Sequence, residues 1–363
     1  MKILIEFLWE TEAPPVFSYG LAAGLKANGH DVYCIMLEQT ENRAQWLETF
    51  GPSHLYFIPE TIKRNRPISS AINFLGSCFG IKEKFGKITF DLAIRTFFHP
   101  INPFLFRFIH SKCVADICHD PIPHDGMDPK AAEIYQKQIR NAEDVIVLTK
   151  AFIPVLEDQY GKKLSQIHFM RHGLMAYPRT GAPSQKTDPP ESVNFLFFGR
   201  ITEYKGLHIL AEAYKQLSGK YSNVSLTIAG SGDFSEYENE YKTLPNVRII
   251  NRYIKDTEIE AFFAGGNTVA VLPYTDASQS GIIPIAFDFG IPVIAAKTGG
   301  LTEQLFAGDY GILFEAGNSR ALADAMSVFL ESPETYQTQA AKMREGRELL
   351  RWEKVTEELI NSW

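Results

Sequence analysis

The strongest constraint on the fold is an alternation of strand-like and helical patterns that occurs twice along the chain. Apolar runs at 2–8 and 30–36 enclose a helical pattern at 18–28, and further strand-length runs follow at 55–58, 92–96, 114–118 and 145–148. The alternation restarts at 193–198 and continues to a helical pattern at 319–330. Strands that alternate with helices form parallel sheets, because the helices supply the crossover connections. The sequence therefore predicts two doubly wound α/β domains.

A proline-rich segment separates the two predicted domains. Residues 175–192 contain four prolines and few apolar residues, which interrupts every periodic pattern. We expect domains at 1–174 and 193–345, with this linker between them and a helical tail at 346–363. Open parallel sheets bind ligands beyond the carboxyl ends of their strands, so two such sheets predict a central cleft for a pair of substrates.

Charge and cysteine content exclude several classes of protein. The 36 Lys and Arg against 43 Asp and Glu give a net charge of −7, which argues against a surface that grips nucleic acid throughout. Four scattered cysteines without a CxxC pair predict no disulfide scaffold or zinc site, and fit reduced thiols in a cytosol. Glu6 and Glu10 interrupt the apolar run that a signal peptide would need near the N-terminus, and no window reaches eighteen apolar residues. We expect a cytoplasmic protein without a spanning helix.

The most informative motif lies at 195–214, where a buried strand ends in Gly199 and a helical pattern follows. Arg200 and Lys205 stand in the turn before that helix. Backbone N–H groups at a helix N-terminus favour an anion, and two cations would add charge-assisted contacts to a diphosphate. From this spacing alone, a solvated loop that contains an Arg and a Lys is an equally good interpretation.

Small-residue turns after other strands favour a binding function. Gly230 lies in the IAGSG segment at 228–232, and the ASQSG segment at 277–281 precedes another helix. Glycine lets main-chain amides approach phosphate or sugar oxygens without a Cβ between them. The GIPV segment at 290–293, Gly299, Gly300 and Glu303 complete the set.

These motifs stand in the order GRxxxxKG, IAGSG, VLPY, ASQSG, GIPVIAAKTGGLTE and GILFEAGN. In order and spacing, from about 193 to 330, they resemble the carboxyl-terminal domain of the family 4 glycosyltransferases (group 1). These are retaining enzymes of GT-B architecture, in which two Rossmann-like domains face a central cleft. The resemblance implies a nucleotide-diphosphate sugar as co-substrate and no further cofactor. It also implies contacts of the diphosphate with Gly199, Arg200 and Lys205, of the nucleoside with Gly230, Arg252 and Tyr253, and of the sugar and phosphate with Ser278, Gln279, Ser280, Gly281 and Ile282.

One departure concerns the two glutamates that the family usually has, in the pattern E-x7-E, facing the donor sugar and the ribose. Ungapped alignment places Ala277 and Ile285 at these positions, and neither side chain can hydrogen-bond a hydroxyl. The ASQSG loop is similar to that of a subgroup with A-T/S-Q-S-G here, in which the polar loop residues, Asp276 or the backbone must replace the carboxylates. The alternative is a non-catalytic GT-B protein that binds a nucleotide or sugar as a partner subunit.

The amino-terminal half resembles the family through the segment DICHDPIPHDG at 116–126. His119 and Asp120 end a strand, at a point where the family often has a histidine that faces the donor sugar and the acceptor. The resemblance implies a catalytic role for His119, with Asp120 and then His124 as further candidates. Without the resemblance, a lone histidine after an apolar strand would be interpreted as a structural residue. His172 and Gly173 resemble the family's turn before the linker, and we expect a hinge there.

The predicted reaction is transfer of a sugar, with retention, to a glycan or lipid-linked acceptor in bacterial surface polysaccharide assembly. Such a transfer depends on stabilising the leaving diphosphate and on holding the acceptor hydroxyl on the same sugar face. Arg200, Lys205 and a helix N-terminus can supply the charge of a metal ion, and the sequence has no DxD motif, so we expect no metal. A nucleotide-sugar epimerase is the less favoured enzyme, because no acid/base pair for it is identified. The tail crosses back to the first domain in this family.

A basic and aromatic stretch at 61–112 suggests the acceptor side. This stretch contains nine Lys and Arg residues but only two acidic residues, and nine phenylalanines lie among them. This combination suits a surface that rests on anionic lipid headgroups. The acceptor would then be a polyprenyl-diphosphate-linked sugar or another glycolipid, and the protein would be peripheral on the inner face of the plasma membrane. A core of buried phenylalanines with an incidental basic rim is an equally good interpretation. We expect no nucleic acid partner, because no recognised module accompanies the stretch. The residues are Lys63, Arg64, Arg66, Lys82, Lys84, Lys87, Arg95, Arg107 and Lys112, with Phe74, Phe79, Phe85, Phe90, Phe97, Phe98, Phe104, Phe106 and Phe108.

Overall fold

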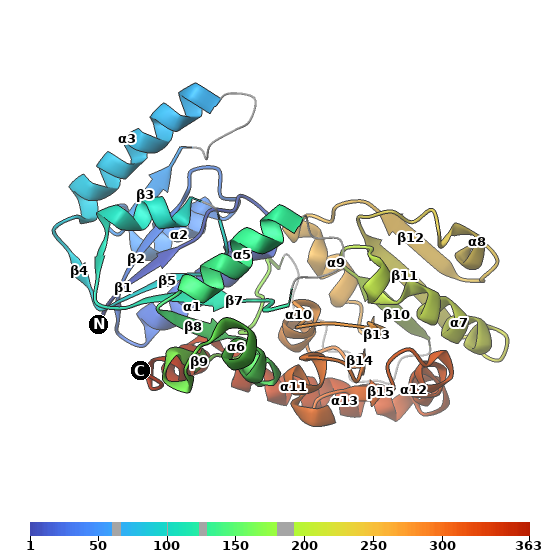
Figure 1. The fold of residues 1–363 in the computed structure, drawn as a ribbon. Coiled ribbons are helices and arrows are strands. Elements are labelled where there is room, and N and C mark those ends of the chain that lie inside the picture. The colour runs from blue at the N-terminus through green and yellow to red at the C-terminus, as the bar shows by residue number, and fades with distance from the viewer. Residues whose placement is uncertain (60–66, 100, 123–128, 180–191) are drawn as a thin grey trace. The chain divides into compact units, whose positions relative to one another are not determined.

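The computed structural model describes residues 1–59, 67–99, 101–122, 129–179 and 192–363 (Figure 1). The chain divides into two compact units: Met1–Gly173 together with Arg351–Trp363, and Leu174–Leu350. His124, Lys63, Arg64, Arg66 and most of the predicted linker lie outside the described residues. Each unit is described below by itself.

The described part of the first unit is built on a seven-stranded parallel sheet in the order β3-β2-β1-β5-β7-β8-β9. Parallel register is continuous across the centre; Glu6 of β1 pairs with Arg95 of β5, which pairs with Asp116 of β7. The strands are β1 (Lys2–Glu6), β2 (Asp31–Leu37), β3 (Leu55–Ile58), β5 (Leu92–Arg95), β7 (Val114–Cys118), β8 (Asp144–Val147) and β9 (Ile167–Phe169), and β4 (Thr89–Phe90) pairs separately with β6 (His110–Ser111). The helices are α1 (Ala13–Ala27), α2 (Arg43–Phe50), α3 (Pro67–Phe85), α4 (Asn102–Leu105), α5 (Pro129–Asn141), α6 (Ile153–Tyr160) and α14 (Trp352–Ile360).

Helix α1 begins earlier than the sequence pattern predicts. The pattern places Pro14 and Pro15 in a loop and starts the helix at Ser18, whereas in the structure both prolines lie in the first helical turn. The first backbone N–H groups of a helix have no intrahelical acceptor, so proline costs little there and its fixed φ suits the helix. The prolines therefore start the helix and do not precede it.

The tail from Arg351 onward belongs to the first unit because α14 packs against α1. A Cβ built on Gly20 would lie 2.0 Å from the indole nitrogen of Trp352, so the small α1 residue makes room for the ring. Asn28 Nδ2 donates to the Glu353 carbonyl at 2.7 Å and to Thr356 Oγ1 at 2.9 Å. These contacts hold α14 against α1.

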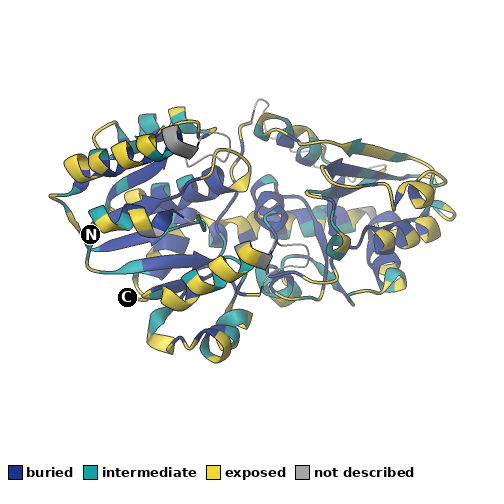
Figure 2. Ribbon diagram, turned by 45° about the horizontal axis from the view of Figure 1, so that its top comes forward, coloured by how far each residue is buried: buried dark blue, intermediate teal, exposed yellow. Residues whose placement is uncertain are grey.

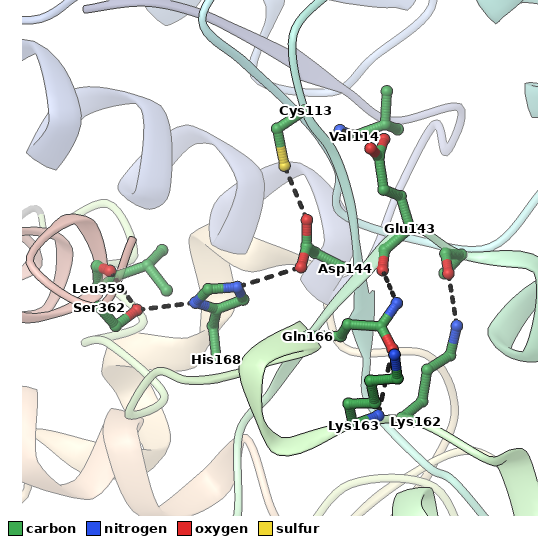
Figure 3. Close-up of polar contacts among 11 residues, drawn as sticks. Cys113, Val114, Glu143, Asp144, Lys162, Lys163, Gln166, His168, Leu359 and Ser362 are labelled. Atoms are coloured by element: carbon green, nitrogen blue, oxygen red, sulfur yellow. Dashed lines mark hydrogen bonds and ion pairs between the residues drawn. The ribbon is translucent and has the colours of Figure 1, made fainter.

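Figure 3 shows a second set of contacts that anchors the tail. Ser362 Oγ lies 3.0 Å from His168 Nδ1, and His168 Nε2 lies 3.4 Å from Asp144 Oδ1. Cys113 Sγ donates to the other Asp144 oxygen at 2.9 Å, and the Trp363 ring stacks on His168 with centroids 3.7 Å apart. Asp144 opens β8, so these contacts lie at the amino-terminal edge of the sheet, opposite the edge where ligands bind.

The described part of the second unit contains a six-stranded parallel sheet in the order β12-β11-β10-β13-β14-β15. The central strands are buried on both faces, while β12 is an exposed edge strand (Figure 2). The strands are β10 (Val193–Phe198), β11 (Val224–Gly230), β12 (Val247–Asn251), β13 (Thr268–Leu272), β14 (Val293–Ala296) and β15 (Ile312–Phe314). The helices are α7 (Leu207–Ser218), α8 (Glu238–Tyr241), α9 (Ile259–Phe263), α10 (Ile282–Phe289), α11 (Leu301–Gln304), α12 (Ser319–Glu331) and α13 (Pro333–Gly346).

Both sheets confirm the predicted doubly wound α/β fold. In each sheet the chain order reverses once, between β1 and β5 in the first unit and between β10 and β13 in the second. Helices that follow neighbouring strands diverge at such a switch point, which leaves a crevice outside the carboxyl ends of those two strands. The switch points therefore indicate where each unit would hold a ligand.

Candidate functional site

The candidate site of the second unit lies at the carboxyl ends of β10 and β13. Gly199 follows β10 directly, and its amide donates to the Ala229 carbonyl of β11 at 2.9 Å. A short 3-10 turn (Glu203–Lys205) then leads into α7, and the Thr275 amide, beyond β13, donates to the Tyr204 carbonyl at 2.8 Å. The loops after the two strands are therefore joined by a backbone hydrogen bond at the switch point.

Lys205 is the predicted cation that lies within this site. Its Nζ donates to Tyr274 Oη at 3.2 Å and lies 4.9 Å from the centre of the same ring. A Cβ built on Gly199 would lie 3.2 Å from that Nζ, so the lysine amine stands beside the glycine backbone. Arg200 is exposed immediately after Gly199. Both predicted cations are thus at the carboxyl end of β10.

Tyr274 and Gln304 are site residues that sequence reasoning missed. Tyr274 is buried, and its hydroxyl lies 3.4 Å from Ser280 Oγ. Gln304 Oε1 accepts from the Ser280 amide at 2.8 Å, and Gln304 Nε2 donates to the Ser280 carbonyl at 3.1 Å. The VLPY segment contained the signal for Tyr274, whereas only the fold shows that α11 brings Gln304 to this loop. Together these contacts connect Lys205 to the ASQSG loop.

The Gly-Gly turn after β14 holds the start of the same loop. The Gly300 amide donates to the Ala277 carbonyl at 3.1 Å, and a Cβ built on Gly299 would lie 1.7 Å from that oxygen. Gly299 also has φ 42°, in the left-handed region that glycine adopts at little cost. Only glycine fits at this position without moving the loop.

Helix α10 begins at Ile282, directly after the ASQSG loop. The Ile282 amide donates to Ser280 Oγ at 3.3 Å, and the Ile282 side chain lies 3.8 Å from a Cβ built on Gly199. A Cβ built on Gly281 would have no heavy atom within 4 Å, and its φ is −65°. The backbone at Gly281 is therefore open, beside a helix N-terminus and Lys205. This arrangement suits an anion such as a phosphate.

The predicted polar loop residues are partly committed to the fold. Ser278 and Ser280 are buried, and Gln279 is half-buried. Ala277 and Ile285 are buried and bring no carboxylate to the loop. Recognition of a sugar here would therefore use serine hydroxyls, the Gln279 amide and main-chain groups.

The residues predicted to contact a nucleoside lie at the carboxyl ends of two strands: Gly230 ends β11, and Arg252 and Tyr253 follow β12. A Cβ built on Gly230 would lie 1.9 Å from the Gly199 carbonyl, so glycine lets the ends of β10 and β11 meet. Arg252 is exposed and binds Glu258 through two hydrogen bonds of 2.9 and 2.6 Å, which lower the pKa of Glu258 to about 2. Tyr253 is exposed beside it. Arg252 would have to leave this ion pair to bind a ligand with its guanidinium.

His119 lies in the first unit, at the carboxyl end of β7. Its Nε2 lies 2.9 Å from the Thr96 carbonyl, and its ring stacks on Phe97 with centroids 4.2 Å apart. A carbonyl only accepts, so Nε2 carries the proton. Burial lowers the pKa of His119, which keeps the ring neutral at pH 7. The Asp120 amide donates to the Tyr135 hydroxyl at 3.4 Å.

His172 lies near His119, and both rings contact Phe17. Its Nδ1 lies 2.8 Å from the Gly173 carbonyl, and burial lowers the pKa of His172 to about 4. A Cβ built on Gly173 would lie 2.5 Å from the Trp352 ring. The residues predicted as a hinge are therefore packed against the tail and against the surroundings of His119.

Sequence reasoning also missed a buried polar cluster at the switch point of the first unit. Glu6 is fully buried, and burial raises its pKa to about 8 although Arg95 is nearby. Arg95 Nε donates to Asp116 Oδ1 at 2.7 Å, and Gln138 Nε2 donates to the same oxygen at 2.7 Å. The signal was a charged residue at the end of β1 and of β5 and in the middle of β7, among apolar neighbours.

Two absences hold for the described residues only. In that part of the chain, no group of three or more His, Cys, Asp or Glu side chains is placed to hold a metal ion. Among the same residues, no helix is both long enough and apolar enough to cross a membrane.

Comparison with known proteins relates the second unit to a family of enzymes. Residues 182–346, somewhat under half of the chain, match the family described as glycosyl transferases group 1. An uncharacterized glycosyltransferase of Haemophilus influenzae is 26% identical over 224 residues, which cover 61% of each chain. The chain spans between half and about three fifths of the length of the first curated relatives it matches.

Solved structures cover the whole chain. Sucrose-phosphate synthase from Thermosynechococcus elongatus superposes with a TM-score of 0.70 at 18% identity, covering 99% of this chain and 97% of the other. Anabaena HepE in complex with UDP-glucose superposes with a TM-score of 0.69 at 18% identity over both full chains. The chain therefore has the GT-B fold, and its residues 182–346 match the group 1 glycosyl transferases.

Proposed function

We propose that this chain is a glycosyltransferase of family 4 that uses a nucleotide-diphosphate sugar and retains the anomeric configuration. The observation that supports this most is the meeting of Lys205, the open backbone at Gly281 and the N-terminus of α10 within the segment that matches the group 1 family. An amine, an open glycine backbone and a helix N-terminus together make a site for a diphosphate.

The same groups would stabilise the leaving diphosphate. Negative charge grows on the diphosphate as the bond to the sugar breaks, and donors fixed in advance lower the energy of that state. Lys205 is held by Tyr274 and the loop is held by Gln304, so neither must reorganise during the reaction. Arg200 and Lys205 supply positive charge here, and we propose that the enzyme works without a metal ion or further cofactor.

His119 is our candidate for a catalytic residue in the first unit. Its ring orientation is set by the Thr96 carbonyl and by stacking on Phe97. A neutral imidazole in a fixed orientation can hydrogen-bond a sugar hydroxyl or orient an acceptor. Asp120 follows it directly and is the second candidate. Gly230, Arg252 and Tyr253 are proposed to meet the nucleoside.

UDP-glucose is the first donor to test, because the HepE structure, which shares this fold, was determined with that compound. The proposed acceptor is a glycan or a polyprenyl-linked sugar in the assembly of a bacterial surface polysaccharide. Such a reaction would take place in the cytoplasm.

Substitution of Gly281 tests the donor site without disturbing the fold. Gly281→Ala places a methyl group in open space at an ordinary φ, so melting temperature should stay within about 1 °C of wild type. The methyl group would stand where a phosphate oxygen approaches, and donor affinity should fall at least about tenfold. Full donor affinity in the variant would contradict the assigned loop.

A product of the same anomeric configuration as the donor, identified by NMR, would support retention.

The second candidate is a non-catalytic protein that binds a nucleotide or a sugar as a partner subunit. The observation that favours it is the absence of a carboxylate at Ala277 and Ile285. Slow hydrolysis of the donor in the absence of acceptor separates the two functions. A transferase should release nucleoside diphosphate, and release should stop in Lys205→Ala. Tight donor binding without hydrolysis or transfer would favour the second candidate.

A further inference from the structure

Helix α3 exposes a stripe of large apolar side chains. Ile72, Leu75 and Phe79 are 63%, 56% and 66% exposed and follow one another at intervals of three and four residues, so they lie on one helix face. The opposite face packs into the core of the first unit through Phe74, Cys78, Ile81 and Phe85. Figure 1 shows α3 on the outside of that unit.

The stripe continues onto the turn that follows α4. The Phe79 ring lies 6.4 Å from the Phe108 ring, which belongs to the 3-10 turn Phe106–Phe108. Phe104 is 51% exposed, and the Arg107 guanidinium lies 5.4 Å from its ring centre. We define the α3 patch as Ile72, Leu75, Phe79, Phe104 and Phe108.

Exposed cations lie near the patch in the chain. Lys82 lies one turn beyond Phe79, and Lys87 and Arg107 are also exposed. In contrast, Lys84 donates to the Pro52 and Leu55 carbonyls, at 2.7 and 2.5 Å, and its amine serves the fold. In the sequence, three further cations stand just before α3, at positions 63, 64 and 66.

The fold divides the nine phenylalanines of the basic stretch. Phe74, Phe85 and Phe90 are buried in the core, as the structural interpretation of the stretch expects. Phe97 stacks on His119, Phe98 contacts Tyr135, and Phe106 is partly buried against the core. Only Phe79, Phe104 and Phe108 contribute to the patch, with Ile72 and Leu75, which the sequence pattern did not single out. The buried phenylalanines therefore cannot belong to a membrane surface, and membrane contact through the exposed ones stays a prediction.

We propose that the α3 patch docks the protein on an anionic lipid bilayer. Large apolar side chains on an exposed helix face suit insertion at the headgroup level, and exposed Lys and Arg suit the phosphates beside them. Arg95 is held by Asp116 inside the unit, but Lys82, Lys87 and Arg107 are exposed in a chain of net charge −7. An anionic surface would therefore attract this segment while repelling the rest. The charge distribution would thus orient the protein. The proposal does not depend on the transfer reaction.

Co-sedimentation with vesicles tests the docking directly. We expect wild type to bind vesicles of phosphatidylcholine with phosphatidylglycerol, and to bind pure phosphatidylcholine at least about tenfold more weakly. The double variant Leu75→Ser with Phe79→Ser should lose at least about tenfold in partitioning, and Lys82→Gln with Arg107→Gln should lose the preference for anionic vesicles. The matched control is Leu164→Ser, at a leucine that is 64% exposed elsewhere on the same unit, and it should bind as wild type does.

Two outcomes would overturn the proposal. Absence of binding to both vesicle types would exclude a bilayer as the occupant of the patch. Equal loss in Leu164→Ser would show that the patch has no special role. Sedimentation of wild type and the double variant without lipid tests whether a second copy of the chain occupies the patch instead. If wild type is a dimer, the double variant is a monomer and neither binds vesicles, the patch is a dimer interface. Thermal shift with nucleotide sugars should be unchanged in every variant, so failure of docking is separable from failure of donor binding.

Discussion

Replacing Glu6 by glutamine should remove a pH dependence from the stability of the first unit. Glu6 is fully buried, and both of its carboxyl oxygens lack a hydrogen-bond partner among the described residues. Burial raises its pKa from 4.5 to about 8, with Arg95 opposing the shift and Asp116 adding to it. Between pH 4.5 and 8 the folded protein therefore keeps a proton on Glu6 that the unfolded chain has already released.

The sign and size of the effect follow from this proton. Where the folded state binds more protons than the unfolded state, the free energy of unfolding falls as the pH rises. The free energy of unfolding should fall by about 1.4 kcal/mol per pH unit. Relative to low pH, ionisation of Glu6 should lower it by about 3 kcal/mol at pH 7 and by about 5 kcal/mol above pH 8. Below pH 4.5 the cost vanishes. Glutamine has a similar shape and no proton to lose, so Glu6→Gln should lack this slope.

Tryptophan fluorescence during urea unfolding is a suitable assay, because all four tryptophans lie in the first unit: Trp9, Trp46, Trp352 and Trp363. The free energy of unfolding would be measured from pH 5 to pH 9 for wild type, Glu6→Gln and the exposed control Glu10→Gln. The difference between wild type and Glu6→Gln should grow by several kcal/mol toward high pH, while Glu10→Gln follows wild type. Parallel curves for wild type and Glu6→Gln would refute the raised pKa.

Three further substitutions test other parts of the structure. Gly299→Ala should lower the stability of the second unit by at least about 1 kcal/mol, from left-handed backbone strain alone, and abolish donor binding, as thermal melting with and without donor would show. Gly20→Ala places a methyl group against the Trp352 indole and should loosen the tail, seen as a red shift of tryptophan emission; unchanged emission would contradict the packing of α14 on α1. Asp288→Asn removes the carboxylate that binds Arg179 at 2.6 Å and Arg347 at 2.8 Å. Both guanidiniums are partly exposed to water, so the free energy of unfolding should fall by only about 1–2 kcal/mol. Circular dichroism melting should show this loss, and an unchanged melting curve would mean that these ion pairs contribute nothing.

The fold was predictable from the sequence because apolar strands and amphipathic helices alternate with periods of two and 3.6 residues. The glycines of the candidate site were also predictable, since Gly199, Gly230 and Gly299 stand where strands end and loops begin. The start of α1 was not predictable, because proline usually indicates a helix break, and the sequence does not show that Pro14 and Pro15 lie in the first helical turn. The exposure of each phenylalanine in α3 depends on which helix face meets the sheet.

The rest of the site depends on contacts between distant parts of the chain. Gln304 reaches Ser280 across 24 positions, and the sequence near Ser280 contains no sign of this contact. Glu6 is polar at the end of an apolar strand, which signals a special position but does not indicate that the carboxyl group remains protonated. That property follows from burial, which only the packed structure determines.

The proposed function requires that Arg200, Lys205 and the loop before α10 bind the diphosphate of a donor. A thermal-shift panel of UDP, GDP, ADP and CMP with their sugars, on wild type and on the Arg200→Ala, Lys205→Ala double variant, tests it most directly, because ligands that bind the folded state raise its melting temperature. We predict a shift for one nucleotide and its sugar that is lost in the double variant, while the variant without ligand melts as a folded protein. A shift of the same size in the double variant, or no shift with any nucleotide, would contradict the account.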